Sequence, residues 1–279
     1  MKTIILAGTT LRVSRLGFGT ASLHHLLWRR ERVELLKAAL DCGITHFDTA
    51  RMYGEGLAER ELGRFLGGGR KRVTIGTKFG LPAVGGLERF PAMLYAHRAL
   101  GGIARRVLPA WRGKRERCVT PAAVEESLER SLRALRTDYC DIFFLHEPCE
   151  ADGGLMEDTV AYLERQKRDG RIRYLGVAGE ARECVAFARW AGGVFEVLQV
   201  RDSLENREAD CLAAAGKKLQ ITYGYLRAAR GAGGGNADIR EVMGKALGRT
   251  EEGMILVSSR KASRLRALAE VAGEKEAGQ

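Results

Sequence analysis

With 279 residues, 45% of them hydrophobic and 29% charged, the chain is long enough and apolar enough to bury a core, which excludes a disordered protein. Its six cysteines are scattered without metal-ligand spacing, so we expect reduced thiols, no disulfide scaffold and no metal site. The formal net charge of +11 would suit nucleic acid, but acidic residues interrupt most basic clusters, so we expect no nucleic-acid partner.

The first predicted element is a β-hairpin at the start of the chain. The residues MKTIILAGTTLRVS suggest two short strands with a turn near residues 7–9, which would plug the N-terminal end of a barrel. This start lacks the pattern of a secretory signal, and no apolar stretch reaches bilayer length. We therefore expect a cytoplasmic protein with no membrane partner.

Eight short apolar or β-branched runs follow the hairpin, and segments with helical periodicity separate most of them. Strands that alternate with helices predict a parallel sheet. No G-x-G-x-x-G motif follows the first run, so the pattern favours a closed (β/α)8 TIM barrel over a doubly wound sheet, as a single α/β domain over residues 1–279. The predicted strands are residues 16–19, 44–48, 73–78, 141–146, 172–177, 195–200, 219–225 and 254–258.

Two helices have clear signals in the sequence. Thr120 is a predicted N-cap before Pro121, and Val124, Leu128, Leu132 and Leu135 share one face of the helix that follows. Val33, Leu36 and Leu40 form a second stripe, which ends at Gly43. Gly170 is likewise expected to end a helix, just before the predicted strand at residues 172–177. The long segment 81–118 follows a strand end, so we expect it to be a loop over the active-site face.

Polar side chains stand where three predicted strands end. Asp48, Lys78 and His146 occupy these ends, and Tyr53 lies five residues past Asp48. In a barrel such ends meet at one mouth. This set suits proton donation to a carbonyl oxygen, because an ammonium lowers the pKa of a neighbouring phenol and a carboxylate orients the ammonium, while the histidine hydrogen-bonds the carbonyl. Each residue alone has a structural explanation, but four together favour a site.

Six motifs carry a likeness to a known family: LGFGT, GITHFDTARMYGEGLAERELGRFL, VTIGTKFG, SLERSLRALRTDYCDIFFLHEP, GRIRYLGV and LQV. With them the sequence resembles the aldo-keto reductase family, from LGFGTASL near the start to SRLR near the end. The block FDTA-x-x-YG-x-G followed by TK and LH is more specific than any single motif. The resemblance implies that Asp48, Tyr53, Lys78 and His146 form the catalytic tetrad, with Tyr53 as the general acid.

The resemblance also implies NADPH as the cofactor, bound across the barrel mouth, and a small carbonyl compound as the substrate. In VSSRKASRLR, two hydroxyls and an arginine suit the doubly charged 2′-phosphate of NADPH. Candidate substrate contacts are Trp28, Tyr53 and His146. The positions that match cofactor contacts are Gly19, Thr20, Asp48, Gln199, Tyr223, Leu226, Ser258, Ser259 and Arg264.

The chain departs from the family pattern at three places. Residues 178–179 are Ala-Gly where Ser-Asn usually contacts the carboxamide, residues 224–227 read GYLR where Ser-Pro-Leu-Gly is usual, and residues 267–268 are Ala-Leu in place of Glu-Asn near adenine. Two functions therefore stay open: an NADPH-dependent reductase of aldehydes or ketones, or a cofactor-binding regulatory or scaffold protein with little turnover. A barrel lyase or isomerase would have no use for the four residues together. The sequence indicates no oligomeric state.

Overall fold

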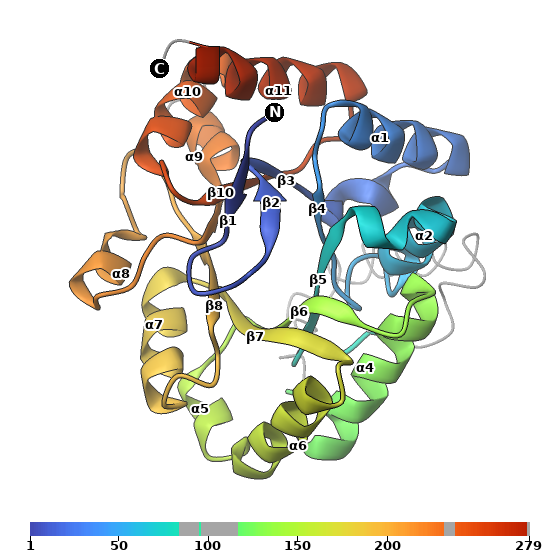
Figure 1. Ribbon diagram of the computed structural model, residues 1–279, viewed down its shortest axis with the longest axis vertical. Coiled ribbons are helices and arrows are strands. Elements are labelled where there is room, and N and C mark those ends of the chain that lie inside the picture. The colour runs from blue at the N-terminus through green and yellow to red at the C-terminus, as the bar shows by residue number, and fades with distance from the viewer. Residues whose placement is uncertain (84–94, 96–116, 232–237, 278–279) are drawn as a thin grey trace, which may run out of the picture.

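The computed structural model describes residues 1–83, 95, 117–231 and 238–277, and there the chain forms a closed barrel of parallel strands (Figure 1). The strands follow one another around the ring in chain order, and the last pairs with the first. All eight predicted strands and the predicted fold class are confirmed. The strands are β3 (Leu16–Gly19), β4 (His46–Asp48), β5 (Thr74–Phe79), β6 (Cys140–His146), β7 (Ile172–Gly179), β8 (Val197–Arg201), β9 (Ile221–Tyr223) and β10 (Met254–Val257).

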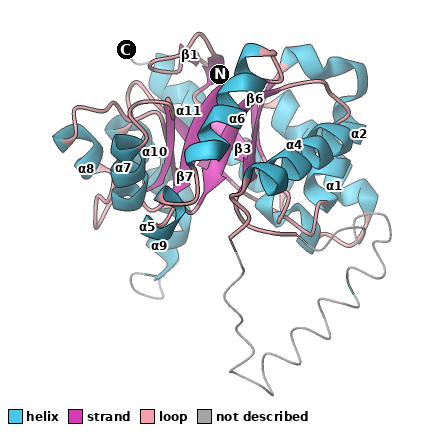
Figure 2. Ribbon diagram, turned by 90° about the horizontal axis from the view of Figure 1, so that it is seen from below, coloured by secondary structure: helices cyan, strands magenta, loops and turns pink. Residues whose placement is uncertain are grey.

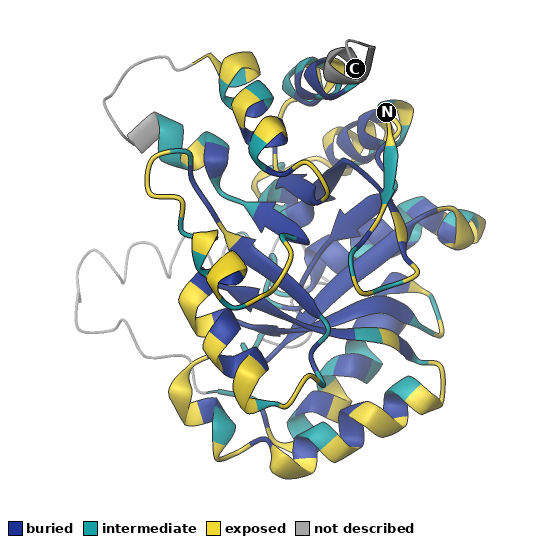
Figure 3. Ribbon diagram, turned by 60° about the vertical axis from the view of Figure 1, so that its left-hand side comes forward, coloured by how far each residue is buried: buried dark blue, intermediate teal, exposed yellow. Residues whose placement is uncertain are grey.

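Helices surround the strands on the outside, with their buried faces toward the barrel (Figures 2 and 3). Among the described residues, no helix combines the length and the apolar character needed to cross a membrane. The described helices are η1 (Thr20–His25), α1 (Arg29–Asp41), α2 (Leu57–Leu66), η2 (Gly67–Arg72), α4 (Pro121–Leu135), α5 (Glu150–Gly153), α6 (Glu157–Arg168), α7 (Ala181–Trp190), α8 (Asp210–Ala214), α9 (Tyr225–Gly231), α10 (Ile239–Arg249) and α11 (Ala262–Ala277).

The N-terminal hairpin plugs the end of the barrel at which the strands begin. Strands β1 (Thr3–Ile5) and β2 (Arg12–Ser14) pair antiparallel, and the amide of Thr9 donates to the carbonyl of Leu6 in the predicted turn. Leu6, Leu11 and Val13 belong to the same buried cluster as the inward side chains of the barrel. Figure 2 shows β1 at one end of the molecule and α5 and α9, which follow strands, at the other.

Glycines make room for one large ring inside the barrel. A methyl group on Gly76 would lie 2.9 Å from the Phe144 ring, and one on Gly176 would lie 2.5 Å from it. Phe144 is fully buried between these neighbours. Because barrel interiors of this size are filled by side chains, one bulky ring beside two glycines satisfies the packing without a void.

The predicted helix signals are confirmed, with one correction. The hydroxyl of Thr120 accepts from the amide of Ala123 at the start of α4, and Gly43 and Gly170 both have positive φ after their helices. The buried face of α1 differs from the predicted stripe, because Val33 and Leu40 are only half-buried. The buried residues of α1 are Arg32, Leu35, Leu36, Ala38 and Ala39.

Arg32 belongs to the buried face of α1, because its guanidinium has hydrogen-bond partners in the protein interior. It donates to Glu61 of α2 at 3.3 Å and to the carbonyl of Leu26 at 2.6 Å. Of the segment 81–118, the described end residue Cys118 returns to β5, where its amide donates to the carbonyl of Gly80. The predicted position of this segment over the active-site face otherwise lies outside the described residues.

A buried histidine on β4 makes a prediction about acid stability. His46 is fully buried, and its Nδ1 lies 2.8 Å from the hydroxyl of Thr74. Burial lowers the pKa of His46 from 6.5 to about 4. Between these values the unfolded chain binds a proton that the folded chain does not. The free energy of unfolding should therefore fall as the pH drops through this window, by up to about 1.4 kcal/mol per pH unit.

Urea unfolding at a series of pH values from 6.5 toward 5 measures this slope. The His46→Gln variant should lose that part of the slope, while His25→Gln, which changes an exposed ring whose pKa is lowered less, should keep most of it. An unchanged slope in His46→Gln would contradict the assignment.

Candidate active site

The cavity at the barrel mouth is built by strand alternation. Since successive side chains of a strand point to opposite faces, every second residue faces the barrel interior. On β6 the inward residues Ile142 and Phe144 are followed by His146 at the strand end. The last inward residues of all eight strands meet at one cavity of about 390 Å³. They are Gly19, Asp48, Lys78, His146, Ala178, Gln199, Tyr223 and, just past β10, Ser258.

Three of the predicted catalytic side chains are joined by hydrogen bonds. The ammonium of Lys78 donates to Asp48 Oδ1 at 2.6 Å and to the phenol oxygen of Tyr53 at 3.2 Å. It also donates to the backbone carbonyl of Thr49 at 2.9 Å. His146 faces the same phenol, with its ring centroid 6.0 Å from that of Tyr53 and the planes nearly perpendicular. The structure therefore brings all four residues of the predicted tetrad to one point.

The acidity of Tyr53 differs from the expectation. Burial raises the pKa of Tyr53 well above its ordinary value of 10, and the carboxylates of Asp48 and Glu147 raise it further. The expectation of a lowered pKa is therefore wrong for this site, because desolvation has the largest effect and both carboxylates act in the same direction. Burial also lowers the pKa of Lys78. The phenol thus stays protonated, as a proton donor requires.

A second buried ion pair holds the loop that carries Tyr53. Arg51 donates to Glu59 at 2.7 Å, and the hydroxyl of Thr77 donates to the other oxygen of Glu59 at 2.6 Å. Glu59 is fully buried on α2. These contacts tie the loop to α2 and β5. These contacts were not predicted from the sequence, although Glu59 lies only six residues past Tyr53.

Glycine is needed in this loop at Gly56. Its φ is +95°, and a methyl group there would lie 2.8 Å from the guanidinium nitrogens of Arg51. The left-handed backbone is costly for any residue with a side chain, and the contact adds to that cost. Gly56 therefore lets Arg51 fold back over the loop and reach Glu59.

The residue after His146 adds a carboxylate to the mouth. Glu147 lines the cavity and has φ of +49°, held by its amide, which donates to the carbonyl of Ala178 at 2.6 Å. The carbonyl of His146 accepts from Arg117, whose guanidinium is paired with Asp152. These contacts fix the end of β6, on which His146 stands.

Gln199 provides the test of whether the cavity suits a nicotinamide. Its side chain is buried in the cavity wall, and its Oε1 has no hydrogen-bond partner among the described residues. A buried acceptor without a donor is unfavourable by about 1–3 kcal/mol, so an incoming amide N–H would be favoured there. Tyr223 lies on the next strand, and burial raises its pKa above the ordinary value. An amide and an aromatic ring in one wall fit a nicotinamide carboxamide and ring.

The other predicted cofactor contacts divide into two groups. Leu226 lines the cavity with Gly19 and Ser258. Thr20 and Ser259 are buried outside the lining, where Thr20 donates to the carbonyl of Asp48 and Ser259 hydrogen-bonds the backbone of Lys261. Arg264 is half-buried on α11 and has no carboxylate partner in the described chain.

Two further predictions concern the rim and metals. Trp28, the candidate substrate contact, is 72% exposed and is not among the residues that line the cavity. Across the described residues, no group of three or more His, Cys, Asp or Glu side chains could hold a metal ion.

Comparisons of the sequence with a family model and with curated proteins point to the same family. A model of the Aldo/keto reductase family matches residues 15–205, more than half of the chain. The chain is 28% identical over 230 residues to the aldo-keto reductase YhdN of Bacillus subtilis strain 168, covering 79% of this chain and 61% of that protein. It is 29% identical over 187 residues to a D-threo-aldose 1-dehydrogenase of Pseudomonas, covering 65% and 55%. The matches thus span about three fifths or less of these relatives.

Solved structures share the fold over nearly the whole chain. A putative aldo-keto reductase from Pseudomonas aeruginosa superposes with a TM-score of 0.73 at 22% identity, covering 98% of this chain and 94% of that chain. An aldo-keto reductase from Klebsiella pneumoniae in complex with NADPH gives a TM-score of 0.67 at 22% identity, covering 100% and 94%.

The buried ion pair at the cavity floor leads to a stability prediction. Lys78→Met would leave Asp48 buried without its cation, so the free energy of unfolding should fall by about 3 kcal/mol. Lys218→Met removes a pair of similar length, 2.7 Å to Glu252, in which both side chains are exposed, and should have little effect. Urea unfolding of both variants measures the difference.

The double variant Asp48→Asn with Lys78→Met completes the test. It should lose less stability than the sum of the two single variants, because no lone charge stays buried. Equal effects of Lys78→Met and Lys218→Met would contradict the importance of burial.

Proposed function

The chain belongs to the aldo/keto reductase family, and we propose that it is an NADPH-dependent oxidoreductase that reduces an aldehyde or a ketone to an alcohol. The observation that carries the proposal is the contact of one ammonium, Lys78 Nζ, with both the phenol of Tyr53 and the carboxylate of Asp48. A cavity opens directly onto this group. The similar Klebsiella structure contains NADPH, which supports the choice of cofactor.

Tyr53 is the proton donor in this proposal. Its hydroxyl proton passes to the carbonyl oxygen of the substrate, and the phenolate left behind is stabilised by Lys78 at 3.2 Å. Asp48 holds Lys78 in place, while His146 orients the carbonyl by a hydrogen bond. NADPH, when bound, supplies the hydride to the carbonyl carbon.

The raised pKa of Tyr53 shapes this step. A phenol that is hard to ionise remains protonated at neutral pH, which preserves the donor but makes the transfer depend on Lys78. As negative charge develops on the phenol oxygen, its attraction to the ammonium strengthens. The pair therefore favours the transition state over the ground state.

Residues around the mouth would hold the cofactor along its length. The unpartnered Oε1 of Gln199 would accept from the carboxamide, and Tyr223 would stack on the nicotinamide ring. Ser258 and Arg264 would hold the 2′-phosphate, for which Arg264 is suited because it has no carboxylate partner in the described chain. Arg227, in the first turn of α9 after β9, adds a cation to the cavity wall.

One observation favours the second candidate, a cofactor-binding regulatory protein with little turnover. Ala178 lies beside Gln199 in the register of β7 and β8, and it brings no hydroxyl to the carboxamide. Nicotinamide positioning would then depend on Gln199 and backbone groups. Cofactor binding without turnover across a broad panel of aldehydes and ketones would support this candidate over the reductase.

Substitution of the proton donor tests the proposal. Tyr53→Phe should lower kcat/KM for NADPH-dependent carbonyl reduction by about 10²- to 10⁴-fold, since the general acid is lost, while NADPH affinity stays nearly unchanged. Tyr174→Phe is the matched control, because that hydroxyl contacts Thr10 at the far end of the barrel. If Tyr53→Phe turned over as fast as the unmodified protein, Tyr53 would not be the donor.

Cofactor choice can be measured by quenching of protein fluorescence. Arg264→Leu should weaken NADPH binding on the order of tenfold to a hundredfold, because a charge-assisted contact to the 2′-phosphate is lost, and should leave NADH binding unchanged. Arg266→Leu, an exposed cation on the same helix, is the control. Equal loss for both cofactors would place Arg264 outside the phosphate site.

A further inference from the structure

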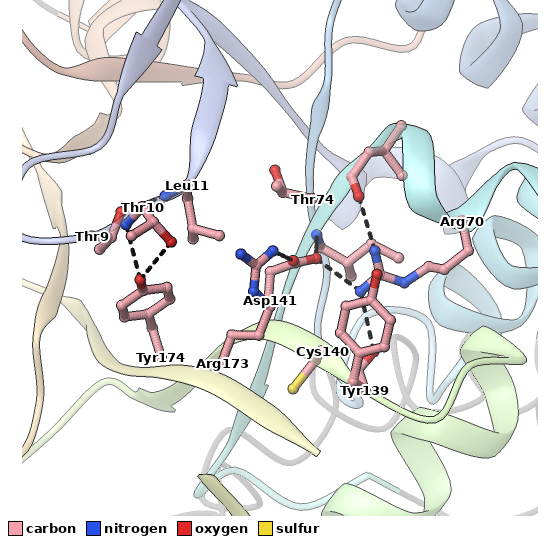
Figure 4. A network of polar contacts seen from close by, with 12 residues as sticks. Thr9, Thr10, Leu11, Arg70, Thr74, Tyr139, Cys140, Asp141, Arg173 and Tyr174 are labelled. Carbon is pink, nitrogen blue, oxygen red and sulfur yellow. Dashed lines mark hydrogen bonds and ion pairs between the residues drawn. The ribbon is translucent and has the colours of Figure 1, made fainter. Parts of the chain in front are cut away.

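A second hollow lies at the opposite end of the barrel from the active site. It has a volume of about 230 Å³ and opens between the turn of the hairpin and the first residues of β5, β6 and β7 (Figure 4). We call it the basal hollow, defined by Arg12, Lys71, Arg72, Tyr139, Asp141 and Arg173. None of these residues contributes to the cavity at the mouth.

The charges around the basal hollow are strongly unbalanced. Four of its six defining residues are cations, and among the described residues that line it Asp141 is the one carboxylate. Lys71 and Arg72 are adjacent in the chain, and neither has a hydrogen-bond or ion-pair partner within the described part of the chain. Elsewhere exposed cations often have a carboxylate partner, as Lys218 has in Glu252. Like charges that line one hollow favour a bound anion there.

Asp141 does not neutralise Arg12, Lys71 and Arg72, because its charge is already compensated by two other guanidinium groups. It is buried, and its oxygens accept from Arg70 at 2.8 Å, from Arg173 at 2.8 Å and from the amide of Ile75 at 2.8 Å. Two guanidinium groups thus share one carboxylate. The remaining N–H groups of Arg173 are available to a ligand, and the ion pair with Asp141 holds this guanidinium in a defined place.

The walls of the basal hollow are fixed by contacts of their own. Arg70 lies 4.1 Å above the ring of Tyr139 and donates to the carbonyl of Val73, so the ring and the strand start are held together. On the other side, the hydroxyl of Tyr174 accepts from the amide of Thr10 at 2.9 Å and ties the hairpin turn to β7. Figure 4 shows Arg173 between these two anchored walls.

We propose that the basal hollow is a binding site for a small phosphate-bearing molecule, with the phosphate held by Lys71, Arg72 and Arg173. A phosphate dianion matches several converging cations better than a single carboxylate does, and guanidinium groups bind it through paired N–H donors. The Tyr139 ring, which is half-buried, gives the remainder of the ligand an aromatic surface. This site is independent of the proposed reductase activity.

The test is calorimetric titration with inorganic phosphate and with glycerol phosphate, at constant ionic strength and with NADP⁺ saturating. The unmodified protein should bind both. The variant Lys71→Glu with Arg72→Glu should weaken binding on the order of tenfold to a hundredfold. The control, Lys217→Glu with Lys218→Glu, makes the same charge change in an adjacent exposed pair before β9, across the barrel from β5, and should bind like the unmodified protein.

Each outcome decides the proposal. Stronger binding of glycerol phosphate than of inorganic phosphate identifies a phosphate monoester as the ligand, and the reverse order identifies free phosphate. Equally weakened phosphate binding in both double variants would mean that overall charge, and not the basal hollow, controls binding. Unchanged binding in both would mean that phosphate binds elsewhere. Succinate binding as strongly as phosphate would overturn the ligand class. Arg173→Gln, which leaves Arg70 on Asp141, should also weaken binding if the site is correct.

Discussion

The ammonium of Lys78 lies inside a closed barrel, where an isolated charge would be costly, and the carboxylate of Asp48 at 2.6 Å makes its burial possible. Because the two residues stand at the ends of neighbouring strands, the pair also sets how β4 and β5 end relative to each other. Tyr53 completes the group from the loop beyond β4. Tyr53, Lys78 and Asp48 therefore form one buried hydrogen-bonded group, and the chemistry proposed for the chain depends on the burial of this group.

Two more features keep this group in place. The second buried pair, Arg51 with Glu59, fastens the Tyr53 loop to α2, and Thr77 links that pair to the strand that carries Lys78. At the barrel centre, Phe144 fills the space that two glycines leave, which gives the strands a firm interior below the cavity. The two ends of the barrel thus differ in charge: the ion pair of Lys78 with Asp48 lies at the mouth, whereas Lys71 and Arg72 line the basal hollow without a partner in the described part of the chain.

The strands, and the meeting of Asp48, Tyr53, Lys78 and His146 at one mouth, were predictable because they depend on local pattern and on motif. Alternation in a strand is visible in the sequence, and a barrel sends all strand ends to one mouth. The buried face of α1 was mispredicted because Arg32 finds partners on α2, and the sequence does not show that a charged residue will be buried. The sequence equally does not show that Gln199 Oε1 lacks a hydrogen-bond partner among the described residues, since this depends on what the neighbouring strands offer.

By itself the sequence determined the order of the elements, the closed barrel and the residue types at the strand ends, because these follow from periodicity and from the chain's own motifs. Only the tertiary structure decided how acidic Tyr53 is, since its pKa is raised by burial and by the nearby carboxylates of Asp48 and Glu147. It alone also brought Lys71 and Arg72 to the same hollow as Arg173, residues about a hundred positions apart in the chain. Both results rest on distances through space, which a linear pattern does not contain.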